Sequence, residues 1–384
     1  MNTKDAVRPA GAVTPPVTQT LWTIQVLRGI AALMVVIGHS QSAVAGVVAS
    51  AGTVFARSTL VPWGAGVDLF FVISGFIIVH ASTLLFGRPG ARAEFLRRRL
   101  IRIVPLYWLV TTLFLVLLAT AAWKGGNALP STEAILASYA FMPADTHGDG
   151  LLFPVFDLGW TLNYEMFFYA LLAFVVAWSR GRALTVLSVI LAVVIGTGLF
   201  VPGPSAVWFW TRPIILDFSL GVVVGALVSR GNVLPTPLRM IVAISGTAVL
   251  LADPFHVFDS GQGGTVANDW PRVLVAGVPI AMIVAAAVLG PEPRIPRAGL
   301  PFTRIGDASY SLYMFHPFAL ITMEKLAQKL PMARTLPGWL LVAGSVTASI
   351  IIALAAYRWI ERPMTAVLAR RLTPRPRLIP APAA

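Results

Sequence analysis

Two basic side chains in the first long apolar stretch are spaced so that they could act together. Arg28 and His39 are eleven residues apart, and eleven helical steps of about 100° bring the second side chain to within about 20° of the first. The two would share one face of a helix, about 16 Å apart along its axis. Such an arginine could hold a bulky anionic donor whose reactive end reaches an acceptor beside the histidine, which can take a proton near neutral pH. A snorkelling arginine and a hydrogen-bonded structural histidine are the alternative.

Three more ionisable side chains interrupt later apolar stretches: Asp68, Glu165 and His316. A carboxylate beside an imidazole fixes its tautomer and raises its basicity, so we expect Asp68 or Glu165 to orient His39. Asp68 could instead cap the start of its helix. His316 directly precedes Pro317, and a proline inside a helix frees backbone carbonyls. His316 could therefore either act in the site or satisfy those carbonyls.

A basic segment supplies candidate anion-binding residues: Arg97, Arg98, Arg99 and Arg102. Arginines beside a membrane span are expected on its cytoplasmic side, where they contact anionic lipid headgroups. The planar guanidinium also binds phosphate, so several arginines at one mouth of the protein would suit a phosphorylated ligand. The sequence leaves both interpretations open.

Other residues limit the chemistry. No set of His, Asp and Glu has the spacing of a metal site, and the chain has no cysteine. We therefore predict no metal and exclude a cysteine nucleophile. Asp217 is expected to pair with Arg212, while Gly221 and Gly225 have the spacing of a helix-packing motif.

The composition places these residues in a membrane. Of 384 residues, 57% are hydrophobic and 12% charged, with a mean hydropathy of +0.79, whereas soluble domains carry about 25% charged residues. This excludes a disordered chain, a secreted disulfide scaffold and an ordinary cytosolic enzyme, and it predicts an all-α polytopic integral membrane protein. The apolar runs predict about ten transmembrane helices, near 22–46, 66–86, 103–123, 160–179, 183–201, 213–229, 238–253, 271–290, 306–328 and 337–357.

The net charge of +13 predicts an orientation. With the N-terminus inside, 21 Lys and Arg fall on the inner side and seven on the outer side, as the positive-inside rule requires. Both termini are therefore expected in the cytoplasm, and the dispersal of the arginines over the inner loops argues against a nucleic-acid partner. Residues 1–20 are predicted to be a disordered cytoplasmic tail without a cleavable signal peptide, and 359–384 a basic, Pro-rich cytoplasmic tail.

The segments that carry these residues resemble the membrane acyltransferase family 3. The run 27–33 followed by His39 is similar to that family's Arg-x10-His signature. The other similar segments follow in order along nearly the whole chain: 66–76, 97–105 with Tyr107 and Trp108, 160–165, 309–316 and 361–363. The segment 160–169 looks most like the exopolysaccharide-production branch, which is related to succinoglycan O-acetylation.

The resemblance implies a transmembrane acyltransferase domain over 21–358 in a bacterial inner membrane. Such an enzyme moves an acyl group, commonly acetyl from acetyl-CoA, to a hydroxyl of an exported polysaccharide or lipid-linked glycan. His39 would act as general base, with Asp68 or Glu165 orienting it, and an acyl-His39 intermediate is left open beside direct transfer. The implied contacts of the CoA phosphates are Arg28, Arg97, Arg98, Arg99 and Arg102. Possible additional site residues are Ser74, Tyr310 and His316.

Two other functions are compatible with the residues alone. A polytopic transporter or flippase for a polysaccharide precursor could use histidine and acidic side chains as a proton relay. A structural subunit of an export complex is the weaker alternative. Mutation of His39 separates the enzyme from the transporter, because only the enzyme needs it for acyl transfer.

Overall fold

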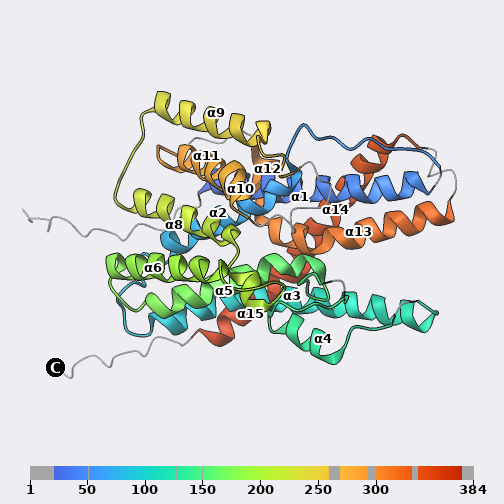
Figure 1. Ribbon diagram of the computed structural model, residues 1–384, viewed down its shortest axis with the longest axis horizontal. Helices are drawn as coiled ribbons and strands as arrows, with labels where there is room; N and C mark the ends of the chain where they lie inside the picture. The colour runs from blue at the N-terminus through green and yellow to red at the C-terminus, as the bar shows by residue number, and fades with distance from the viewer. Residues whose placement is uncertain are drawn as a thin grey trace, which may run out of the picture.

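The computed structural model describes residues 21–50, 52–126, 128–148, 150–258, 269–292, 299–330 and 336–373. Over these residues the chain is helical and has no β-strand (Figure 1), so the all-α class is confirmed. The longer helices are α1 (Trp22–Ala49), α2 (Gly66–Ala81), α3 (Ala91–Trp123), α5 (Trp160–Val175), α6 (Arg180–Gly198), α8 (Leu216–Ser229), α9 (Thr236–Ala252), α11 (Val278–Val288), α13 (Ser309–Lys329) and α14 (Gly338–Ala356).

Short helical segments connect them. They are η1 (Trp63–Ala65), α4 (Thr132–Tyr139), η2 (Asp157–Gly159), α7 (Ala206–Trp210), η3 (Pro213–Ile215), α10 (Trp270–Arg272), η4 (Val273–Gly277), α12 (Leu300–Asp307), η7 (Tyr357–Glu361) and α15 (Arg362–Leu372). Two of them, η4 and η7, are π-helical. The predicted C-terminal tail thus begins as helix, whereas 1–20 and 374–384 lie outside the described residues.

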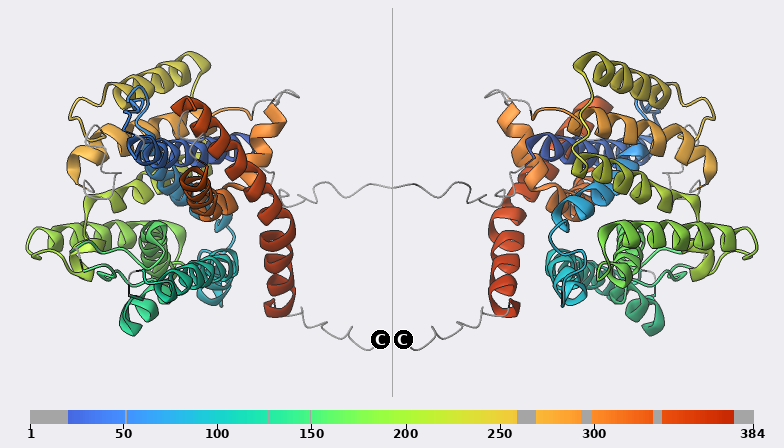
Figure 2. Two further views of the ribbon diagram at one scale, coloured as in Figure 1. Left: turned by 90° about the vertical axis from the view of Figure 1, so that its right-hand side faces the viewer. Right: turned by 90° about the vertical axis from the view of Figure 1, so that its left-hand side faces the viewer.

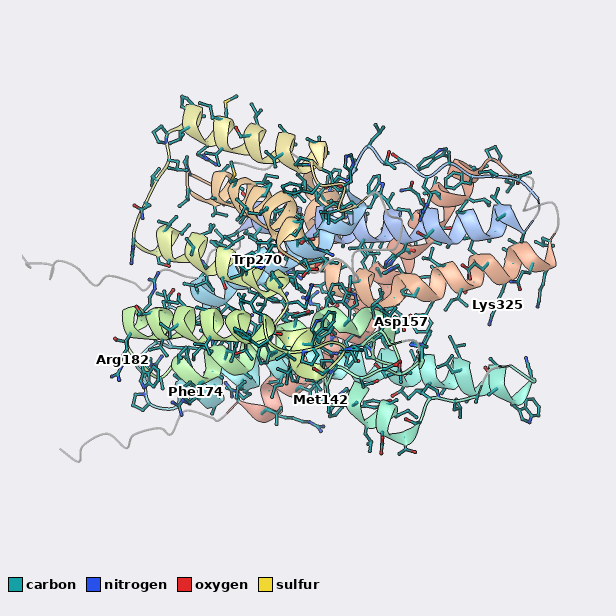
Figure 3. The ribbon with its side chains drawn as sticks, in the orientation of Figure 1. Met142, Asp157, Phe174, Arg182, Trp270 and Lys325 are labelled. Carbon is teal, nitrogen blue, oxygen red and sulfur yellow. The ribbon has the colours of Figure 1, made fainter. Side chains whose placement is uncertain are left out.

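Each of the ten predicted spans overlaps a helix. By length and apolarity, seven helical stretches of the described chain could cross a membrane: Trp22–Ala49, Trp63–Ala81, Ala91–Trp123, Asp157–Val175, Arg180–Gly198, Trp270–Val288 and Gly338–Leu372. The apolar helices Pro213–Ser229 and Thr236–Ala252 are shorter. A count of ten spans and the side of the termini remain predictions. Arg182, which the charge count places on the inner side, lies at the opposite end of the molecule from Lys325, which it places on the outer side (Figure 3).

The helix that carries Arg28 and His39 is packed on several sides. Helix α1 contacts α2, α12, α13 and α14, and it lies alongside α13 in Figure 1. Gly29 packs against the backbone of α12, and Gly66 of α2 packs against the Ala31 carbonyl. The continuous helix α14–η7–α15 passes from the group around α1 to α3 (Figure 2). Both functional residues of α1 are therefore held by a fixed framework.

Glycines bring α2 and α8 into backbone contact. A Cβ at Gly75 would overlap the Phe218 carbonyl, and one at Gly221 would overlap the Val72 carbonyl. Gly225 is less close, since an added Cβ would lie 3.1 Å from the Phe76 carbonyl oxygen. The expected packing role of Gly221 and Gly225 is confirmed.

This contact gives a stability prediction. Gly221→Ala should destabilise the protein by about 1–3 kcal/mol, because α2 and α8 must separate to admit the methyl group. Gly46→Ala is the matched control, since Gly46 is also helical but has no atom within 4 Å of an added Cβ. Alanine there should be neutral or stabilising by up to about 1 kcal/mol. Thermal unfolding in detergent measures both, and equal melting temperatures would refute the backbone contact.

Candidate active site

Two cavities meet inside the bundle. The first, here called the arginine cavity, has a volume of about 80 Å³, and its basic lining residues are Arg28, Arg99 and Arg102. The second, here called the histidine cavity, has a volume of about 360 Å³ and is lined by His39 among others. Val67 and Tyr313 line both cavities. The face shared by Arg28 and His39 thus reaches from one cavity to the other.

The arginine cavity collects part of the predicted anion site. Arg28 donates from Nη1 to Gln25 Oε1 at 3.1 Å. The Arg99 guanidinium lies 5.7 Å from the ring centroids of both Phe95 and Tyr169, and its Nε is buried without a hydrogen-bond partner among the described residues. A buried guanidinium nitrogen without a hydrogen-bond partner costs free energy, so the Arg99 guanidinium is suited to bind an anionic ligand.

Arg97 and Arg98 do not reach this cavity. Both form ion pairs with Glu94, and Arg97 also donates to the Leu372 carbonyl at 2.9 Å. Glu94 explains the division, because it lies three residues before Arg97 and four before Arg98 and pairs with both on the helix surface. The prediction that all four arginines form one site is therefore wrong for Arg97 and Arg98.

Glu165 lies in the arginine cavity and not beside His39. Its Oε1 accepts hydrogen bonds from Ser74 Oγ at 3.2 Å and from the Tyr169 hydroxyl. Tyr310 lines the same cavity and donates to the Ile103 carbonyl at 2.8 Å. Ser74 and Tyr310 thus line the same cavity as Glu165, and their role in the site remains a prediction. The expected contact of Glu165 with His39 is not formed.

The partner of His39 is His316. His39 Nδ1 lies 2.8 Å from His316 Nε2, and His316 Nδ1 lies 3.1 and 3.0 Å from the carbonyl oxygens of Leu312 and Tyr313. Pro317 has no N–H to donate to the Tyr313 carbonyl, and the histidine supplies that hydrogen bond. His316 therefore satisfies the freed carbonyl of Tyr313 and also contacts His39, and its action in the site remains a prediction.

These contacts determine the tautomers. Carbonyl oxygens only accept, so His316 Nδ1 carries a proton and its Nε2 is an acceptor in the neutral ring. His39 then donates from Nδ1, which leaves its Nε2 lone pair to accept a proton. A histidine oriented through one nitrogen and basic at the other is the arrangement of a general base.

Asp68 has a different partner from the one expected. Its carboxylate accepts two hydrogen bonds from Arg272, from Nε at 2.9 Å and from Nη2 at 2.8 Å, and both side chains are fully buried. Asp68 makes no side-chain cap of α2. The predictions that Asp68 orients His39 or caps its helix are both wrong, and the residue joins α2 to α10.

Asp217 belongs to the same buried cluster. It lies close to Asp68 and Arg272, whereas Arg212, its expected partner, forms an ion pair with Asp269. Sequence reasoning missed Arg272, which the charge count assigned to an outer loop. Two features of the sequence could have indicated it. Arg272 stands at the start of an apolar run, and the carboxylates of Asp68 and Asp217 within predicted spans need a cationic partner.

Comparison with known proteins identifies the family of the chain. A family model described as "Acyltransferase domain", of acyltransferase family 3, matches residues 21–358. The exopolysaccharide production protein ExoZ of Rhizobium meliloti is 33% identical over 308 residues, which cover 78% of this chain and 89% of the relative. The peptidoglycan O-acetyltransferase OatA of Listeria monocytogenes is 26% identical over 329 residues, 78% of this chain but about half (51%) of the relative. No solved structure gives a significant match. The chain therefore belongs to acyltransferase family 3 and is a multi-pass membrane enzyme.

Proposed function

We propose that the protein is an O-acetyltransferase of a bacterial inner membrane. It takes the acyl group from acetyl-CoA, or another acyl-CoA, on the cytoplasmic side. The acceptor is a hydroxyl of an exported polysaccharide or lipid-linked glycan. The proposal draws on the names of the two relatives, one an exopolysaccharide production protein and one a peptidoglycan O-acetyltransferase, and on the two adjoining cavities.

The arginine cavity is the donor site in this proposal. Arg28, Arg99 and Arg102 would bind the phosphates of CoA, because guanidinium groups hold phosphate oxygens through paired hydrogen bonds. Glu165, which accepts hydrogen bonds from Ser74 and Tyr169, also lines this cavity and is opposite in charge to these arginines. The flexible arm of CoA would carry the thioester past Val67 and Tyr313 towards His39.

His39 acts as the general base on the acceptor. Its Nε2 takes the proton of the sugar hydroxyl as the oxygen attacks the thioester carbonyl carbon. The new C–O bond forms and the C–S bond breaks, so the acetyl ester and the thiolate of CoA are the immediate products. The thiolate then takes the proton from the His39 imidazolium, which returns to its neutral form. His316 keeps the ring oriented through this cycle.

The observation that carries the proposal is the His39–His316 pair in a cavity that adjoins a cluster of arginines. NMR and mass analysis of surface glycans, with and without the gene, tests it in the cell. Loss of O-acetyl groups on deletion supports the proposal. Unchanged acylation together with impaired glycan export would instead support the transporter alternative.

The donor site gives a binding prediction. Arg28→Ala should weaken acetyl-CoA binding by about 10- to 100-fold, since a hydrogen bond to a charged group contributes about 1.5–3 kcal/mol. Arg98→Ala is the matched control, because Arg98 lies on the same side of the predicted membrane but is paired with Glu94 outside the cavity. Equilibrium binding to the purified protein measures both, and an unchanged affinity of the Arg28 variant would count against its role.

A further inference from the structure

The boundary between the two cavities is formed by two side chains. Val67 and Tyr313 line both the arginine cavity and the histidine cavity, and both are buried. We call this boundary the neck. In the proposed function the phosphates of the donor stay with the arginines while the thioester reaches His39, so the acyl group must pass the neck first.

One side of the neck is held firmly. The Tyr313 hydroxyl donates to the Leu158 carbonyl at 3.1 Å and lies 3.0 Å from Thr161 Oγ1. Leu158 lines the histidine cavity and Thr161 lines the arginine cavity, so the hydroxyl is anchored at their junction. The ring meets Phe70 edge-on, with the centroids 5.9 Å apart.

The other side is held by the backbone. Val67 follows Gly66, whose Cα packs so closely on α1 that an added Cβ would lie 2.6 Å from the Ala31 carbonyl oxygen. The start of α2 therefore cannot approach α1 further, which fixes the position of Val67 relative to α1. The Val67 side chain forms this side of the neck.

Part of the lining beside the neck is apolar. Phe70, Phe71 and Ile73 line the arginine cavity together with Val67. An ionised acyl group that moves from the arginines into the neck gives up its hydration and its cationic partners, which costs several kcal/mol. A small neutral acyl group has no charge to desolvate and avoids this cost.

We propose that the neck of Val67 and Tyr313 selects the acyl group, and that it admits small, neutral, unbranched acyl groups and rejects branched or ionised ones. The proposal rests on the proposed function, because it assigns a path to the acyl-CoA donor. It adds a specificity-determining role for two residues that do not react.

The test compares donors on the purified protein in lipid nanodiscs. Transfer to isolated surface glycan is followed with acetyl-, isobutyryl- and malonyl-CoA. The wild type should prefer acetyl to both other donors. Val67→Ala should raise the isobutyryl-to-acetyl rate ratio about tenfold or more, since one methylene in an apolar pocket contributes about 10- to 200-fold. Malonyl transfer should stay low, because its carboxylate must still be desolvated.

Val72→Ala is the matched control. Val72 is a buried valine of the same helix that lines neither cavity, so its variant should keep the wild-type donor preference, and melting temperatures report folding. An unchanged ratio in a folded, acetyl-transferring Val67→Ala variant would overturn the neck while leaving the proposed function intact. No transfer from any acyl-CoA by the folded wild type would overturn both.

Discussion

Replacement of His39 by alanine is expected to lower the rate of acetyl transfer by about 10²- to 10⁴-fold, the contribution of a positioned general base. A sugar hydroxyl is a poor nucleophile at neutral pH, so its proton must leave as the C–O bond forms. The variant has no group in place of Nε2 to take that proton. Transfer of labelled acetyl from acetyl-CoA to glycan, measured on protein in nanodiscs, gives the rate.

Two controls separate loss of the base from loss of the fold or of the donor. His80→Ala removes another histidine within a predicted span, which stacks on Phe76 and lines neither cavity. It should keep nearly full activity. The affinity of the His39 variant for CoA should match that of the wild type, because the arginine cavity is untouched. Retention of more than a tenth of the activity by the His39 variant would remove it from the mechanism.

The sequence predicts the arrangement of residues on one helix better than contacts between residues on different helices. Helical geometry alone put Arg28 and His39 on one face, and α1 carries them to two adjoining cavities. The same geometry does not separate all four arginines of α3, since Arg98 lies four residues before Arg102 and shares its side of the helix. The available local signal was Glu94, three and four residues before Arg97 and Arg98, which forms ion pairs with both.

Partners on different helices could not be predicted in this way. Asp68 was expected beside His39 because a carboxylate can orient an imidazole, but Arg272, 204 residues later, forms its ion pair. A single sequence does not specify which helices are neighbours. The effect of Pro317 was local and correctly described, whereas the contact of His316 with His39 depends on the packing of α13 against α1.

Replacement of Arg272 by alanine is expected to destabilise the protein by about 3–5 kcal/mol, because it leaves a buried charge without its partner. Arg272 and Asp68 are both fully buried, and Asp217 lies next to them. The variant therefore leaves the side chains of Asp68 and Asp217 close together without the Arg272 guanidinium. The change also frees α10, which begins at Trp270 (Figure 3), from α2.

Thermal unfolding in detergent should show a large drop in melting temperature for Arg272→Ala, and little change for Arg182→Ala, whose side chain is exposed. The double variant Arg272→Met with Asp68→Asn should recover part of the loss, since it removes both charges of the pair, and a buried ion pair replaced as a unit is often tolerated. Equal stability of the two arginine variants would mean that the Asp68–Arg272 pair does not hold α10 to α2. If the double variant melts at no higher temperature than Arg272→Ala, the loss of stability is assigned to Asp217, the carboxylate that neither change removes.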